Sequence, residues 1–350
     1  MPVVAVVALV LTWGRQPGSA VLVAVALLLA GAVLAAVHHA EVVAHWVGEP
    51  FGSLVLAVAV TVIEVALIVT LMISGGSGTA SLARDTVFAA VMITCNGILG
   101  LSLFLGALRH GMAVFNAEGT GAALATVAAL ATLSLVLPTF TTSRPGPEFS
   151  PAQLVFAALA SLALYAMFVL TQTVRHRDFF LPVRTADSAI ADEHAPRPDR
   201  RSALSSVAML LVALVAVVGL AKVESPAIEA GVAALGFPPS FVGVVIALLV
   251  LLPETLAAAN AARRNRVQVS LNLALGSAMA SIGLTIPAIA LASIWLPGPL
   301  LLGLGPVQIV LLVLTVVVSV LTVVPGRATR LHGGVHLVLL AAFLFLAASP

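Results

Sequence analysis

The chain has 350 residues, of which 61% are hydrophobic and only 9% are charged. A soluble protein of this length needs a much larger polar surface, so the composition excludes a soluble globular protein and indicates a membrane protein with many spans. The basic pI of about 9.3 does not indicate nucleic-acid binding, because the arginines fall in short loops between apolar segments.

Eleven apolar segments bounded by charged residues, glycine or proline are candidate membrane spans. They cover about residues 2–13, 18–38, 52–74, 82–108, 120–139, 151–173, 204–222, 238–260, 267–295, 300–324 and 331–348. Most reach the roughly 20 residues that a helix needs to cross a bilayer, but the first segment is too short. The sequence therefore predicts an all-α polytopic membrane protein with about eleven transmembrane helices. Cys95 is the only cysteine, which excludes an intrachain disulfide and a CxxC zinc motif.

The charges in the loops predict an orientation. If the connections after the second, fourth, sixth, eighth and tenth segments share one side, that side carries twelve arginines, and the other carries three arginines and Lys222. Loops rich in arginine and lysine are retained on the cytoplasmic side. We therefore expect an integral plasma-membrane protein with a cytoplasmic N-terminus and an outside C-terminus.

His38, Glu41 and His45 lie at the cytoplasmic end of the second segment. Their spacing of i, i+3 and i+7 places them on one face of a continuing helix, where they could form a metal or proton access point. The alternative is that the three residues are ordinary interfacial residues at the end of a helix. The HExxH order of a metalloprotease is missing. His332 and His336, near the start of the last segment, are predicted to be interfacial.

Two glutamates lie deep inside predicted spans. Glu64 is near the middle of the third segment and Glu254 at a similar depth in the eighth, whereas the other twelve acidic residues fall at segment ends or in loops. A charge at such a depth costs a few kcal/mol, and no Arg, Lys or His lies at the same depth to pair with it. Each carboxylate must therefore bind a proton or another cation. The alternative is that one glutamate is permanently protonated and bonded to a neighbouring helix.

Five spans lie on either side of a polar segment between the sixth and seventh spans. Because five is odd, the second half enters the membrane with the opposite orientation, as in inverted-repeat transporters. Glu64 and Glu254 both occupy the second span of their half. A carrier with two buried charged carboxylates is unstable when no cation or proton is bound, which favours obligatory exchange. The polar segment is a flexible cytoplasmic linker by composition, with a regulatory role as the alternative. The predicted parts are an N-terminal helix (1–17), a first repeat (18–174), the linker (175–203) and a second repeat (204–350).

The next span of each half supplies neutral candidate ligands. Asn96 is the only amide in that span of the first half, and the matching span of the second offers Asn272, Ser277 and Ser281, together with Gly276. Pro253 can disrupt helical bonding and free a carbonyl oxygen. Such oxygen ligands suit Ca²⁺, which takes about six to eight of them. The predicted cation- and proton-binding residues are Glu64, Glu254, Asn96, Gly276 and Ser277, although small and polar residues also serve helix packing.

Two stretches resemble the Ca²⁺/cation antiporter superfamily, specifically its bacterial ChaA-type calcium/proton exchanger branch. The first is HHAEVVAHWVGEPFGSLVLAVAVTVIEV, and the second is FVGVVIALLVLLPETLAA followed by NLALGSAMASIGLTIP. The resemblance implies two inverted five-helix repeats plus an N-terminal helix, with Glu64 and Glu254 binding the cation in competition with protons. Glu41, Gly276 and Ser277 also match family positions. The Gly-Asn-Ala that precedes each glutamate in wider calcium/proton exchangers is replaced here, so amide ligands are fewer.

We therefore expect a secondary antiporter that exports Ca²⁺ in exchange for H⁺ through a midplane site of two glutamates. A Na⁺ or K⁺/H⁺ antiporter on the same scaffold is the alternative. An intramembrane enzyme is a more distant alternative, because no GxGD, HExxH or nucleophile-elbow motif supports it. The expected partners are the lipid bilayer and the transported cations and protons, with no resident cofactor and no nucleic acid.

Overall fold

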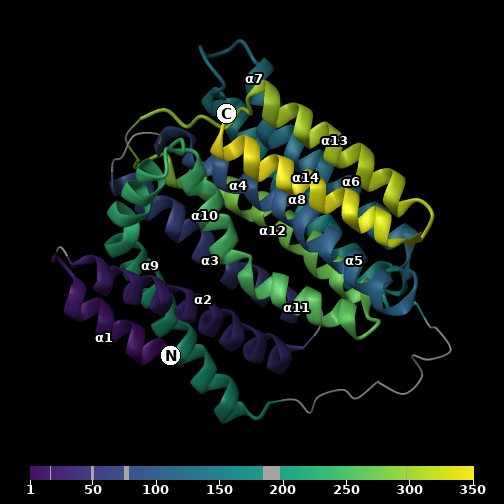
Figure 1. Ribbon diagram of the computed structural model, residues 1–350, viewed down its shortest axis with the longest axis horizontal. Helices are drawn as coiled ribbons and strands as arrows, with labels where there is room; N and C mark the ends of the chain where they lie inside the picture. The colour runs from purple at the N-terminus through teal and green to yellow at the C-terminus, as the bar shows by residue number, and fades with distance from the viewer. Residues whose placement is uncertain (16, 49–50, 75–78, 184–197, 297) are drawn as a thin grey trace.

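The computed structural model describes residues 1–15, 17–48, 51–74, 79–183, 198–296 and 298–350. Apart from one short strand pair these residues form helices (Figure 1). The α-helices are α1 Pro2–Thr12, α2 Ser19–Val47, α3 Phe51–Ser74, α4 Leu82–Met92, α5 Leu99–His110, α6 Ala117–Ala131, α7 Leu137–Phe140, α8 Pro151–Leu170, α9 Arg200–Ala234, α10 Phe241–Val250, α11 Leu252–Arg263, α12 Val267–Ala292, α13 Pro306–Val323 and α14 Arg330–Ala348. The shorter elements are η1 Thr79–Ser81, η2 Ile93–Ile98, η3 Thr132–Val136, η4 Thr171–Arg175 and η5 Arg177–Phe180, with β1 Ala113–Val114 antiparallel to β2 Arg327–Ala328.

The membrane spans follow the predicted segments closely. In the described part of the chain, nine helices are long and apolar enough to cross a membrane, and α10 with α11 makes a tenth span that is bent by 53°. Helix α1 has 11 residues and is about 16 Å long, too short to cross, as its segment predicts. The described residues therefore form ten full spans and one short helix, an all-α membrane fold.

The ten spans divide into two sets of five. Spans α2, α3, α4–α5, α6–α7 and α8 precede the linker, and spans α9, α10–α11, α12, α13 and α14 follow it. Most of the predicted linker, residues 184–197, lies outside the described residues. Of the remainder, η5 forms a single turn and α9 already begins at Arg200.

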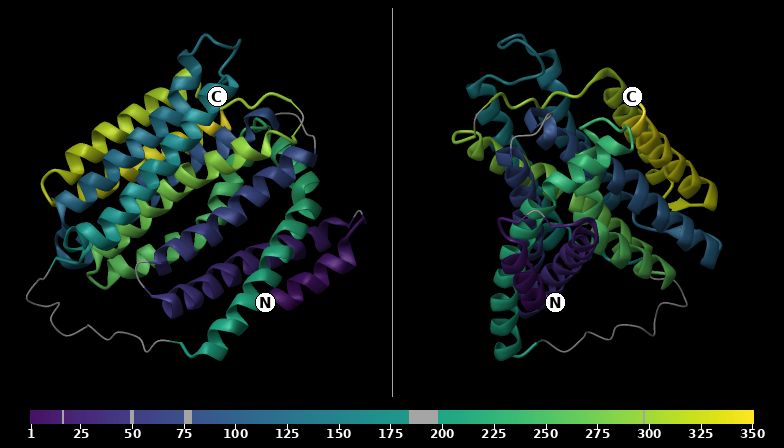
Figure 2. Two further views of the ribbon diagram at one scale, coloured as in Figure 1. Left: turned by 180° about the vertical axis from the view of Figure 1, so that it is seen from behind. Right: turned by 60° about the vertical axis from the view of Figure 1, so that its left-hand side comes forward.

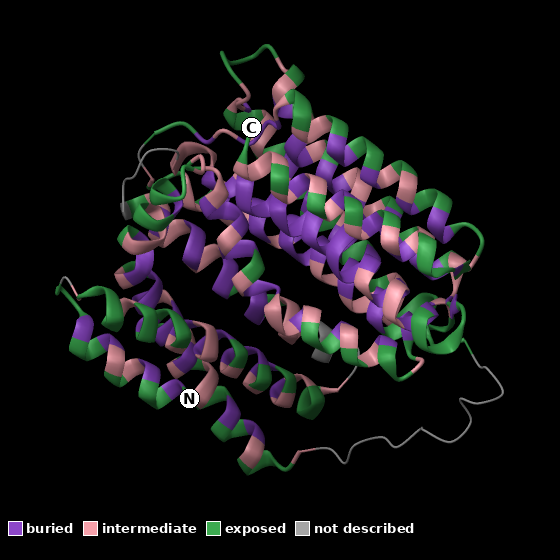
Figure 3. Cartoon of the chain, viewed as in Figure 1, coloured by how far each residue is buried: buried purple, intermediate pink, exposed green. Residues whose placement is uncertain are grey.

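Two hydrophobic cores hold the spans together. One joins α1, α2, α3, α9 and α10, and the other joins α4 to α8 with α11 to α14. Figure 2 shows α1, α2 and α9 together on one flank of the molecule. The span from Thr79 to His110 is the most enclosed, with 83% of its apolar window buried, and the buried colour in Figure 3 is concentrated there and along α12.

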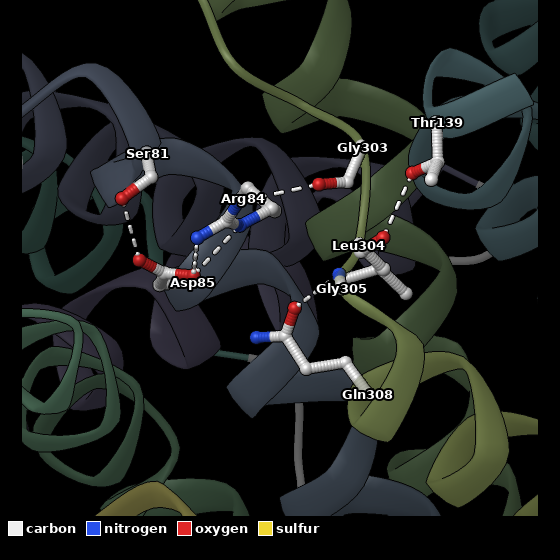
Figure 4. Close-up of polar contacts among 8 residues, drawn as sticks. All are labelled: Ser81, Arg84, Asp85, Thr139, Gly303, Leu304, Gly305 and Gln308. Atoms are coloured by element: carbon white, nitrogen blue, oxygen red, sulfur yellow. Dashed lines mark hydrogen bonds and ion pairs between the residues drawn. The ribbon is translucent and has the colours of Figure 1, made fainter. Parts of the chain in front are cut away.

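The connection between α12 and α13 is fixed against the first repeat by polar contacts (Figure 4). Arg84 forms a 2.8 Å ion pair with Asp85 and donates to the carbonyl of Gly303, while Ser81 donates to the same Asp85 carboxylate. The backbone N–H of Gly303 donates to the carbonyl of Pro147. A Cβ on Gly303 would lie 2.5 Å from the hydroxyl of Thr139, so only glycine fits in this crossing. These contacts join the two repeats at one membrane surface.

One expectation about the acidic residues is wrong. Glu224 was expected at the end of a span closing near residue 222, but α9 continues to Ala234 and buries Glu224 to 4% exposure. The helix propensity of the alanine-rich stretch that follows favours the longer helix. Pro226 lies inside this helix, as prolines can in membrane helices whose neighbours satisfy the freed backbone groups. The Oε1 atom of Glu224 has no hydrogen-bond partner among the described residues.

Candidate functional site

Glu64 lies in the middle of α3 and points into the protein, with 2% exposure. Its Oε2 atom accepts hydrogen bonds from Ser281 at 2.9 Å and from Thr285 at 3.1 Å, both on α12 of the second repeat. Its Oε1 atom is buried and has no partner in the described part of the chain. One oxygen of this carboxylate is therefore held by neutral donors, and the other is left to bind a proton or a cation.

Glu254 lies in the first turn of α11, directly after the break between α10 and α11. The break occurs because Pro253 has no N–H, so the carbonyl of Leu249 loses its α-helical partner and the axis bends. The glutamate is 7% exposed, and its Oε2 atom has no partner among the residues described. The helix N-terminus beside it favours a negative charge, which partly offsets the penalty of burial.

The two glutamates come from opposite repeats, Glu64 on α3 and Glu254 on α11, and both helices pack against α12. No Lys or Arg is buried in the parts of the chain that the structure describes. A pair of buried acids without a basic partner can be neutralised only by protons or metal cations. The unpartnered oxygens Oε1 of Glu64 and Oε2 of Glu254 are the atoms available for this.

Asn96 has its amide directed to other helices. It is fully buried in η2, a π-helical stretch between α4 and α5. Its Nδ2 donates to Thr315 on α13 at 2.9 Å, and its Oδ1 lies 3.1 Å from Nδ1 of His336 on α14. These contacts leave Asn96 out of the hydrogen bonds made by Glu64.

His336 is also fully buried, so its expected interfacial position is wrong. Gly100 lets α14 pack so closely on α5 that the imidazole ring lies inside the protein.

Gly276 and Ser277 lie on α12, one turn before the residues that bond Glu64. Both are partly exposed, and a Cβ on Gly276 would meet nothing within 4 Å, so this glycine does not serve a close helix contact. Ser277, Ser281 and Thr285 are four residues apart and share one face of α12. Ser281 was among the neutral candidate ligands that the sequence offered, whereas Thr285 was missed. The regular spacing of hydroxyl residues after Ser277 is the signal that could have identified Thr285.

The cluster of His38, Glu41 and His45 lies toward the C-terminal end of α2, a helix that contacts both α3 and α11. Glu41 is exposed, and the spacing of the three residues places them along one helix face. Among the described residues, no three His, Cys, Asp or Glu side chains are arranged to hold a metal ion. An exposed acid on a helix that contacts α11 suits a point of access to the pair better than a metal centre.

Ten apolar spans in two halves, with a buried carboxylate from each half, are typical of a membrane cation transporter. Comparison with known proteins agrees: residues 18–174 and 205–348 match the family described as sodium/calcium exchanger protein. The chain belongs to this family, within the Ca²⁺/cation antiporter superfamily.

Three similar proteins illustrate the range of the family. The chain is 49% identical over 92% of its length to y4hA of Sinorhizobium fredii (strain NBRC 101917 / NGR234), named as an ionic transporter, and covers 87% of that protein. It is 35% identical over 98% of its length to the sodium-potassium/proton antiporter ChaA of Escherichia coli (strain K12), covering 93% of it. The structure of native YfkE, a Ca²⁺/H⁺ antiporter protein, matches with a TM-score of 0.73 at 15% identity, over 99% of this chain and 97% of that one. This last likeness shows the fold.

Proposed function

We propose that the protein exports Ca²⁺ from the cytosol in exchange for protons, with Glu64 and Glu254 as the shared binding groups. The observation that carries the proposal is the pair of buried carboxylates, each with an unpartnered oxygen and neither with a basic partner. One divalent cation neutralises both charges, and so do two protons, so the site has the same net charge in either loaded form. The unoccupied pair with both carboxylates charged is energetically unfavourable, so the empty protein does not switch between its inward- and outward-open states. This couples the flux of the cation to the flux of protons.

The neighbouring groups serve the exchange in defined ways. Ser281 and Thr285 hold one oxygen of Glu64, so that Oε1 stays directed to the cation. Glu41 attracts cations from the cytoplasmic surface toward Glu254. Ser277 and Gly276, one turn away on α12, border the open space through which the remaining ligands of a hydrated cation, including water, can approach.

The proposal is tested by ⁴⁵Ca²⁺ uptake into everted membrane vesicles with an acid interior. We expect proton-driven uptake by the wild-type protein and none by Glu64→Gln or Glu254→Gln, because glutamine keeps the shape and removes the charge. Glu118→Gln, which changes an exposed acid at the start of α6, is the matched control and should transport normally. Undiminished uptake by either of the first two variants would show that the pair is not the exchange site.

A second candidate is exchange of Na⁺ or K⁺ for protons. Two observations favour it. The similar protein ChaA is named as a sodium-potassium/proton antiporter. The amide of Asn96 is bonded elsewhere, and the side chains that bond Glu64 among the described residues are the hydroxyl groups of Ser281 and Thr285. Ca²⁺ prefers about six to eight oxygen ligands, whereas fewer are needed for an alkali cation bound with one proton. Competition of Na⁺, K⁺ and Ca²⁺ for uptake in the same vesicles separates the two candidates.

We further propose that the N-terminus is cytoplasmic and the C-terminus outside, from the distribution of arginines. The single cysteine, Cys95, is buried, so the native chain offers a quiet background for surface labelling. We expect Thr142→Cys to react with a membrane-impermeant maleimide on intact cells, and Met112→Cys to react only after permeabilisation. The reverse pattern would invert the topology.

A further inference from the structure

A small cavity of about 80 Å³ lies at the outer end of the protein, where α3 and α9 end and α4 and α10 begin. Its walls are mostly apolar, from Leu71, Val232 and Val242 among others, and Glu229 is the one charged residue among the described residues that line it. Ser225, itself 1% exposed, donates a hydrogen bond of 3.2 Å to Oε1 of this carboxylate. Thr79 is a further polar residue of the lining. Glu229 is half-buried, so Ser225 fixes one carboxylate oxygen while the side chain still borders the cavity.

The cavity lies in line with the glutamate pair. Leu71 follows Glu64 by seven residues on α3, which is two helical turns, so it lies on the same face and about 10 Å nearer the outer surface. Leu67 and Ile68 lie between them, with 2% and 0% exposure. The cavity is therefore separated from the pair by a thin apolar layer, as expected of the outer half of a path that is closed in this conformation.

Glu229 also occupies the position that corresponds to Glu41 in the other repeat. Helices α2 and α9 are the first spans of their halves and run in opposite directions. Glu41 lies six residues before the end of α2 at Val47, and Glu229 lies five residues before the end of α9 at Ala234. An inverted repeat places these two acids at opposite membrane surfaces. Helix α2, which carries Glu41, contacts α11, which carries Glu254.

We propose that Glu229 is a cation-binding group at the outer mouth of the transport path, the counterpart of Glu41 at the inner mouth. Its ligand is the transported hard cation, bound by the carboxylate oxygen that Ser225 leaves unbonded. The inference rests on the proposed function, because it assigns Glu229 to the path of the same ion. It does not require Glu229 to enter the central site, since the layer of Leu67 and Ile68 lies between.

The test compares the two sides of the membrane. Exchange is measured in right-side-out and in everted vesicles, with whichever of ⁴⁵Ca²⁺ and ²²Na⁺ the wild-type protein transports, while the cation concentration is varied on the outward-facing and inward-facing surface in turn. Glu229→Gln should raise the KM for the cation on the outer side about fivefold and leave the inner-side KM unchanged, as expected for loss of one partly screened charge. Glu41→Gln should give the opposite result.

Two further variants make the outcome decisive. Ser225→Ala should raise the outer KM in the same direction but less, because the carboxylate remains. Glu148→Gln removes another acid at the outer surface, one paired with Arg144, and should leave both KM values unchanged, which controls for general surface charge. A Glu229→Gln protein with wild-type KM on both sides, or with equal increases on both, overturns the proposal. If Glu229→Gln gives such a result while Glu64→Gln is inactive in the same experiment, the proposed function stands and only the role of Glu229 is overturned.

Discussion

The two central glutamates differ in their surroundings although they match in sequence position. Oε2 of Glu64 receives two hydroxyl donors from α12, whereas Oε2 of Glu254 has no partner among the described residues. Hydrogen bonds to a charged group contribute about 1.5–3 kcal/mol each. Glu64 is therefore the better prepared cation ligand, and Glu254 depends more on the ion or proton itself.

Removal of the hydroxyl donors should weaken cation binding. We expect Ser281→Ala and Thr285→Val each to raise the KM for the cation roughly tenfold, because a carboxylate with fewer donors favours its protonated form. The increase should be larger at low pH, where protons compete more strongly, and the maximal rate should change little. The measurement is the concentration dependence of proton-driven uptake at two pH values.

The matched control is Ser319→Ala on α13. The hydroxyl of Ser319 is also buried but has no partner in the described part of the chain, so its loss should leave KM unchanged. Equal increases for all three variants would indicate a general packing effect and contradict the role of Ser281 and Thr285.

At the scale of elements, the second spans of the two repeats differ in shape. Helix α3 is continuous past Glu64, whereas α10 and α11 meet at a 53° bend directly before Glu254. The cause is local, since Pro253 removes one donor and its ring excludes the straight helix. The bend places Glu254 at a helix N-terminus, and the equivalent position on α3 lacks that feature.

Straightening the bend should impair transport without unfolding the protein. We expect Pro253→Ala to restore the missing hydrogen bond, move Glu254 from the helix end and lower the transport rate about tenfold or more. Thermal unfolding in detergent should occur at or above the wild-type temperature. Pro306→Ala, at the first turn of α13 where no N–H is needed, is the control and should be silent in both measurements. A fully active Pro253→Ala protein would show that the bend is not needed.

The close contact between α5 and α14 depends on Gly333 as well as on Gly100. A Cβ on Gly333 would lie 2.5 Å from the backbone nitrogen of Phe104 and 2.8 Å from the carbonyl of Gly100, and neither atom can move without shifting a helix. We expect Gly333→Ala to lower the free energy of unfolding by about 1–3 kcal/mol. Gly334→Ala, next to it, meets nothing within 4 Å and should be neutral or slightly stabilising. Equal unfolding midpoints in a urea titration in micelles would contradict this packing.

For the whole molecule, hydropathy was sufficient to predict the spans and their division into two halves. The pair of glutamates was also found from depth alone, because a charge inside a long apolar segment is visible without any contact. Contacts between distant helices were not visible. The amide of Asn96 turns to Thr315 and His336, and Ser281 takes the place next to Glu64, because packing of α13 and α14 decides which face of η2 is covered.

The separation into two hydrophobic cores suits alternating access. The core of α1, α2, α3, α9 and α10 meets the larger core along α3 and α10, the helices that flank the glutamate pair. Movement of one core against the other would open the inner path at Glu41 or the outer path at Glu229 while the pair stays between them. This arrangement serves transport only if a cation is exchanged for protons at Glu64 and Glu254.

The most direct test is proton movement driven by the cation in the purified protein. Proteoliposomes loaded with Ca²⁺, and Na⁺ in parallel, are diluted into cation-free medium with no imposed pH gradient, and a trapped pH dye reports the interior. We predict acidification of the interior as the cation leaves, absent from Glu64→Gln and Glu254→Gln vesicles. Cation efflux without proton influx, or acidification that persists in both variants, would contradict exchange at this pair.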